Sequence, residues 1–126
     1  MALLDDIITQ LEADGVSGGV TGWTSGKSFM PPNPDKMIVV YETGGDQPDQ
    51  TAVTGYSYPT FQVRGRSDEL GYEELRTKMQ AVMDSLKDAD ITGYIYIHPV
   101  QSGLLFIGYD ANQRPEAVIN FKAMKG

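Results

Sequence analysis

Residues 59–86 contain the feature that most constrains the fold: an alternating strand pattern that leads directly into an amphipathic helix pattern. The segment PTFQVRGRS (59–67) alternates apolar and polar residues, with Arg64 and Arg66 on its polar face. The segment YEELRTKMQAVMDSL (72–86) then repeats apolar residues every three or four positions. A strand followed at once by a helix with one apolar stripe predicts a helix packed on a sheet.

Two helices are predicted from this kind of spacing. The stripe of the 72–86 helix consists of Tyr72, Leu75, Met79, Val82, Met83 and Leu86. On its outer face, Glu74 and Lys78 are spaced to form an i,i+4 ion pair. The first segment of the chain predicts another helix, ended by Gly15, with a stripe of Leu3, Leu4, Ile7, Ile8 and Leu11.

Strand patterns occur at 37–43, from 58 onward, and at 94–98, 104–109 and 117–121. The first is a nearly continuous apolar run, which is typical of a strand covered on both faces. Short separations between the last three predict antiparallel hairpins in a three-stranded meander. We therefore expect an α+β fold over residues 1–126: a single small domain with a mostly antiparallel sheet of about five strands and two helices packed on it.

Residues 15–36 are rich in Gly, Ser and Pro and are predicted to form a long flexible loop. Trp23, Phe29 and Met30 lie in this loop without periodic apolar partners. Exposed aromatic residues in loops are common anchors at protein interfaces. The alternative, that they fold back to cap the core, is equally open.

No motif for catalysis or cofactor binding is complete. Residues 24–28 (TSGKS) resemble the end of a P-loop, but the motif needs a glycine at position 21, where Thr21 stands. The chain has no cysteine and a single histidine, His98, which we interpret as a surface residue at a strand end. Asp46 and Asp49 lie in an acidic loop that lacks the twelve-residue spacing of a calcium site. We expect no enzyme activity, cofactor or metal.

The formal net charge of −7 argues against binding of nucleic acid through phosphate neutralisation. The N-terminus is acidic where a secretory signal would be basic, and no apolar run approaches the about 20 residues of a membrane span. We expect a soluble chain made inside the cell, without membrane association. Arg64 and Arg66 are expected to pair with carboxylates of the same subunit or with an acidic face of the next one.

Five segments together carry a resemblance to a known family: LLDDIITQLEADG, IVVYETGG, PTFQVRGRS, YEELRTKMQAVMDSL and LLFIGYDANQRPEAVINFKAMK. Their succession resembles small tail terminator or minor capsid (head–tail joining) proteins of long-tailed bacteriophages. The resemblance covers most of the chain, with residues 15–36 the least matched part. The 62–65 strand segment and the hairpin from Gly108 to Phe121 contribute most to it.

The resemblance implies a structural virion protein that forms a ring, usually hexameric, at the head-proximal end of the tail. Such a ring caps the tail tube, ends its polymerisation and offers a docking surface to the head–tail connector or stopper protein. DNA would pass through the lumen without specific binding. The protein would act in the virion and be present in the host cytoplasm during assembly. Candidate intermolecular contacts are then Trp23, Phe29, Met30, Asp46, Asp49, Arg64 and Arg66.

Three other functions stay open at the level of the sequence. A head-completion or stopper protein on the portal side is the nearest alternative. A small non-enzymatic domain that binds a ligand or a host component is the second, and an enzyme is the third. The oligomeric state in solution would separate the ring-forming proteins from a monomeric binding domain.

Overall fold

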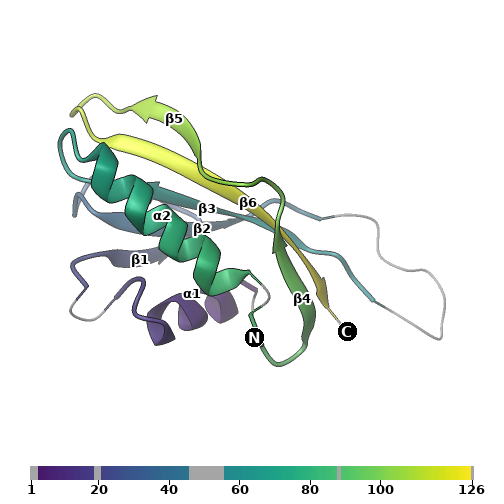
Figure 1. The fold of residues 1–126 in the computed structure, drawn as a ribbon. Coiled ribbons are helices and arrows are strands. Elements are labelled where there is room, and N and C mark those ends of the chain that lie inside the picture. Colours follow the sequence, from purple (N-terminus) through teal and green to yellow (C-terminus); the bar gives the residue numbers. More distant parts are fainter. Residues whose placement is uncertain (1–2, 19–20, 46–55, 88, 126) are drawn as a thin grey trace.

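The computed structural model describes residues 3–18, 21–45, 56–87 and 89–125. Two helices and six strands occur in this part of the chain (Figure 1). Their order is α1 (Leu3–Ala13), β1 (Thr24–Lys27), β2 (Met37–Glu42), β3 (Thr60–Arg66), α2 (Tyr72–Leu86), β4 (Tyr94–Pro99), β5 (Leu105–Tyr109) and β6 (Pro115–Lys125). All strands belong to one sheet in the order β1-β2-β3-β6-β4, and β5 also pairs with β6. The predicted α+β class is confirmed, with six strands instead of about five.

The additional strand is β1, which lies within the segment predicted as a continuous loop. It runs parallel to β2, with Thr24 opposite Met37 and Lys27 opposite Val40. Parallel neighbours need a crossover, and here residues 28–36 form it on the sheet face opposite the helices. Backbone oxygens of Pro34 and Asp35 in this crossover accept hydrogen bonds from the Arg66 guanidinium. Because the crossover covers this face, β2 is buried on both sides, as its continuous apolar sequence predicts.

The predicted three-stranded meander is wrong. Both β4 and β5 pair with β6 and lie on the same side of it, one after the other, while β3 pairs with its other side. The strand β6 has 11 residues, which is long enough to take both partners along one edge. At the interruption between them, the side-chain oxygen of Gln101 accepts a hydrogen bond from the backbone N–H of Asn120 at 3.1 Å. A side chain therefore replaces the missing strand acceptor.

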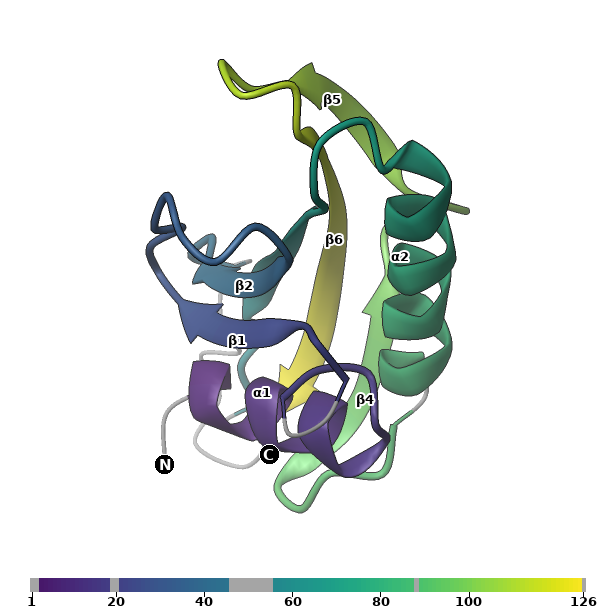
Figure 2. The same ribbon diagram turned by 90° about the vertical axis from the view of Figure 1, so that its left-hand side faces the viewer.

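Both helices pack on one face of the sheet and form its core (Figures 1 and 2). The predicted stripes are confirmed except at Tyr72, which packs on Phe106 instead of the core. The helices bury Leu4, Ile7, Leu11, Leu75, Met79, Val82, Met83 and Leu86, and Leu3 and Ile8 are partly buried. On the sheet side, Phe61 and Phe121 stack with ring centroids 5.1 Å apart. The helix α2 approaches β3 closely at Gly65, where a Cβ atom would lie 2.5 Å from the sulfur of Met79. Glycine is therefore required there by packing.

The predicted ion pair between Glu74 and Lys78 is replaced by bonds to other elements. Glu74 binds the ammonium of Lys36 at 2.8 Å, and Lys78 donates to the backbone oxygen of Val16 at 2.9 Å. Burial lowers the pKa of Lys78. The two residues thus attach α2 to the segments before and after β1. These bonds position α2 relative to β1, which an ion pair within one helix would not do.

Candidate assembly surfaces

Strand β5 exposes apolar side chains at the edge of the sheet. Its exposed residues are Leu105, Phe106, Ile107 and Tyr109, at 40–53% of their full area. In the described residues, β6 is the only strand that pairs with β5, so its other edge is unpaired. An exposed apolar edge strand is normally avoided in soluble proteins, because it adds readily to another chain. The strand is therefore a candidate surface for association with another chain.

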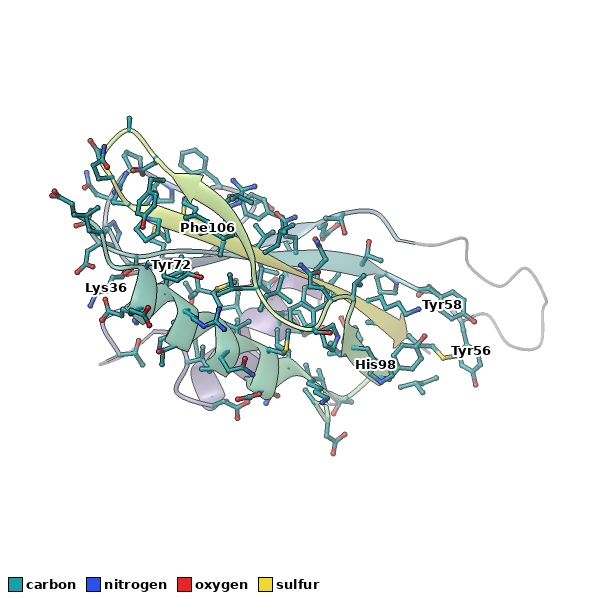
Figure 3. All side chains as sticks on the ribbon, turned by 45° about the horizontal axis from the view of Figure 1, so that its top comes forward. Lys36, Tyr56, Tyr58, Tyr72, His98 and Phe106 are labelled. Carbon is teal, nitrogen blue, oxygen red and sulfur yellow. The ribbon has the colours of Figure 1, made fainter. Side chains whose placement is uncertain are left out.

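The turn before α2 extends this surface. Tyr72 packs edge-on against Phe106, with ring centroids 5.2 Å apart (Figure 3). The Phe106 ring also packs against that of Tyr109, with centroids 5.5 Å apart. Leu70 is 65% exposed and has a φ of 56°, a left-handed conformation that is uncommon for leucine. Its backbone N–H donates to Gln113 in the β5–β6 turn. We call this set the β5 patch: Leu70, Tyr72, Leu105, Phe106, Ile107 and Tyr109.

An ionic network around the buried Arg114 fixes the hairpin that carries the β5 patch. The Arg114 guanidinium binds the Asp110 carboxylate at 2.9 Å and that of Asp35 at 3.0 Å, and it also donates to the Pro32 oxygen. Burial would raise the pKa of Asp110, but hydrogen bonds from the backbone of Arg114 and Asn112, together with the guanidinium, hold it below its usual value. The network joins the β5–β6 turn to the β1–β2 crossover, so the hairpin has a defined position.

The candidate residues of the 15–36 segment have different positions. Trp23 is only 4% exposed and belongs to the core, with the Lys78 and Lys36 ammonium groups 5.5 and 6.0 Å from its ring centroid. Its burial favours the core-cap alternative. Phe29 is 66% exposed and lies two residues after the end of β1, while Met30 is half-buried. Phe29 is therefore the member of this group with the largest accessible surface.

The two arginines of β3 lie on the sheet face opposite the helices, but they differ in exposure. Arg66 is 3% exposed and bonds to the crossover, and burial lowers its pKa. Arg64 keeps 35% of its side chain exposed, lies 3.7 Å from the Glu116 carboxylate and packs over the Tyr41 ring. Contacts within the subunit thus account for Arg66, whereas the Nε of Arg64 is buried without a hydrogen-bond partner and the rest of its side chain has surface available to a neighbour.

The acidic candidates Asp46 and Asp49 lie outside the described residues. Within residues 3–18, 21–45, 56–87 and 89–125, no three His, Cys, Asp or Glu side chains are grouped as metal ligands. In the same ranges, no helix is long and apolar enough to cross a membrane. His98 is exposed at the end of the sheet opposite Phe106 (Figure 3). Its ring stacks on that of Tyr96, with centroids 4.4 Å apart.

The β5 patch was missed in the sequence, although a signal for it exists. The run LLFIGY (104–109) predicts a strand, but its pattern also carries information about exposure. Three consecutive apolar residues, Leu105 to Ile107, place apolar side chains on both faces of one strand. In a strand that lies at a sheet edge beyond the helices, both faces are exposed. Figure 2 shows β5 at the end of the molecule away from α1.

Comparison with known proteins agrees with this architecture. The chain is similar to a chain in a solved structure described as the virion of a native gene transfer agent (GTA) particle. The match has a TM-score of 0.75 at 19% identity and covers 99% of this chain and 96% of the other, so the two share a fold. A search of curated protein sequences finds no match.

The sequence itself matches a protein family over residues 14–125, which includes every strand and α2. The family is described as bacteriophage tail terminator protein. This protein therefore belongs to the bacteriophage tail terminator family and is a structural protein of the phage tail.

Proposed function

We propose that this protein forms a ring, of six copies, that caps the head-proximal end of the phage tail tube. The ring ends polymerisation of the major tail tube protein and provides the surface on which the head–tail connector or stopper protein docks. Membership of the tail terminator family supports this role. The protein would act as an assembly component of the virion, without enzyme activity or a cofactor.

The observation that carries the proposal is the β5 patch. Strands β1 and β4 also have an unpaired edge in the described residues, but only β5 combines such an edge with a group of exposed apolar side chains, Leu105, Phe106, Ile107 and Tyr109. Apolar surface of this kind at a sheet edge marks a site of protein association. Phe29 and Arg64 are further proposed contacts, whereas burial of Trp23 and Arg66 removes most of their surface from an interface.

The acidic composition agrees with a ring through which DNA passes. Each copy carries a formal charge of −7, so a closed ring has a strong excess of negative charge. Acidic groups repel phosphates, and DNA would not adhere to a lumen that carries them. The composition thus fits passage of DNA better than binding of DNA.

Deletion of the gene tests the role directly. Without a cap, tube subunits continue to add by the same heterologous contact, so tails should be irregular, too long and unable to join heads. The lengths are measured by electron microscopy of particles from the deletion strain, complemented in parallel with the wild-type gene. Tails of normal length with leaking heads would contradict the terminator role and support the head-completion or stopper alternative.

A matched pair of substitutions tests whether the β5 patch carries the function. Ile107→Lys places a charge in the patch, whereas Ile95→Lys changes an isoleucine on β4 that is exposed to a similar extent, 54% against 46%. Ile95→Lys should complement the deletion, and Ile107→Lys should give long tails without heads. Equal complementation by both folded variants would show that the patch is not used in the tail.

A further inference from the structure

We propose that strand β5 of one copy pairs with the free edge of β1 in the next copy, so that neighbouring sheets are joined by an antiparallel strand pair. This inference rests on the proposed ring and specifies its subunit contact. A closed ring of more than two copies needs two different patches on each subunit. The opposite edges of this sheet provide them.

The sheet has the correct ends for such a contact. In the described part of the chain, β1 pairs only with β2 and β5 only with β6, and β2, β3 and β6 lie between them (Figure 1). The strand directions follow from the pairings: β1, β2 and β6 run one way, and β3 and β5 run the other. Rotation about an axis along the strands preserves these directions, so β5 meets the next β1 in antiparallel orientation.

The backbone of β1 has two residues that face outward. The N–H of Thr24 donates to the backbone oxygen of Lys36, which directly precedes β2. The N–H of Ser28 donates to the backbone oxygen of Val40 in β2. Because successive residues of a strand point to alternate sides, Gly26 also faces β2, and Ser25 and Lys27 direct N–H and C=O groups away from it. No other described backbone segment hydrogen-bonds to these groups.

The backbone of β5 has a matching pair. The backbone of Pro115 faces β3, because its oxygen accepts a hydrogen bond from the N–H of Ser67 and it has no N–H of its own. Pro115 therefore makes no backbone hydrogen bond to Tyr109, which lies opposite it in β5. The N–H and C=O of Tyr109 consequently point away from β6. Phe106 is opposite Ala117, two residues along β6, and has the same orientation. The register shift between Phe106 and Gly108 inserts one extra residue between the two outward-facing positions.

This bulge makes the two edges compatible. Ser25 and Lys27 are two residues apart, and Phe106 and Tyr109 are two ladder positions apart once the bulged residue is discounted. An antiparallel register with Lys27 opposite Phe106 and Ser25 opposite Tyr109 therefore aligns all four sets of backbone groups. In this register the helix-covered face of one sheet continues into the helix-covered face of the next, because these four side chains all lie on the helix side of their sheets.

Side-chain chemistry supports the same partner. The side chain of Lys27 is 53% exposed, and its ammonium pairs with the Asp5 carboxylate of the same subunit at 2.7 Å. In the proposed register, Lys27 would also lie beside Phe106 and the acidic first turn of α2, which includes Glu73, of the neighbouring copy. A cation beside an aromatic ring and a carboxylate is a favourable arrangement. The five exposed side chains of the β5 patch present roughly 400 Å², which is about half of what one partner contributes to a stable pairwise interface. Closure of a ring, with two such contacts for each copy, compensates for a weak single contact.

Disulfide trapping tests the pairing, because the chain has no cysteine of its own. Purified Lys27→Cys and Phe106→Cys single variants are mixed at high concentration and oxidised, and the heterodimer is quantified on a non-reducing gel. Directly opposite residues have Cα atoms about 5.5 Å apart, within the range of a disulfide. The control mixture combines Phe106→Cys with Lys87→Cys, an exposed position at the end of α2. The opposed pair should form heterodimer about tenfold faster than the control.

A second mixture defines the orientation. In the antiparallel register, Lys27→Cys and Tyr109→Cys are offset by two positions, which separates their Cα atoms by roughly 8 Å and slows the disulfide. Faster trapping of this mixture than of the Phe106 mixture would mean a shifted register or parallel pairing, and either would overturn the proposal. A trapping rate equal to the control, or rapid homodimer formation by Phe106→Cys alone, would also overturn it. Either result would leave the deletion phenotype, and hence the capping role, unaffected.

Discussion

Replacement of Trp23 by alanine distinguishes a core residue from an interface residue. The indole is 4% exposed and belongs to the hydrophobic core, with the Lys36 and Lys78 ammonium groups over its ring. Burial of an aromatic side chain of roughly 200 Å² at about 25 cal/mol per Å² contributes about 5 kcal/mol. Trp23 lies on a connecting segment that can relax into part of the space, so we expect a loss of about 3–4 kcal/mol.

For a chain of this size, 1 kcal/mol corresponds to about 4 °C, so the melting temperature of Trp23→Ala should fall by roughly 12–16 °C. The measurement is calorimetry of the free protein, with urea unfolding to verify an unchanged m value. Phe29→Ala is the control, because this residue is 66% exposed and its loss should change stability by at most about 0.5 kcal/mol. A fall below about 4 °C in Trp23→Ala would refute the core assignment and restore Trp23 as a candidate contact.

Three further outcomes are expected from the packing and the ionic network. Gly65→Ala places a Cβ atom 2.5 Å from the Met79 sulfur and should cost about 1–3 kcal/mol in urea unfolding, and an unchanged midpoint would contradict the close approach of α2 to β3. Arg114→Met removes the guanidinium that pairs with two carboxylates and should lower the free energy of unfolding by about 2–3 kcal/mol. The control Arg76→Met changes an exposed arginine and should lower it by at most about 0.5 kcal/mol. Equal effects of the two substitutions would contradict the network. The lowered pKa of Asp110 contributes stability that is present above about pH 4 and is lost as the pH falls through the folded-state pKa. The free energy of unfolding should therefore decrease less steeply with acid in Asp110→Asn than in the wild type. Parallel pH profiles of the two proteins would contradict this.

The elements with strong periodicity could be predicted from the sequence. Both helices follow from apolar stripes at a 3.6-residue period, and β2 follows from four consecutive apolar residues, Met37 to Val40. These patterns report directly which faces of an element are buried. The α+β class and the predominance of antiparallel pairing followed from the order of the elements.

Two features of the sheet could not be predicted, because they depend on contacts between distant segments. The strand β1 has the sequence TSGK, with no apolar residue, and becomes a strand because β2 offers it an edge. The connection after β4 looks like a hairpin turn, yet β5 continues along β6 because β6 is long enough for both strands. Strand pairing is chosen among all available edges, so local spacing does not determine it.

The candidate surfaces divide in the same way. The sequence by itself determined two helices, a sheet that they cover, an acidic composition and a resemblance to tail terminators. Only the tertiary structure decided that Trp23 is buried, that Arg66 binds the crossover, and that Phe106 and Ile107 are exposed at a free edge. The physical reason is that periodicity records which face of an element avoids water, whereas exposure depends on whether another element occupies the space beside that face.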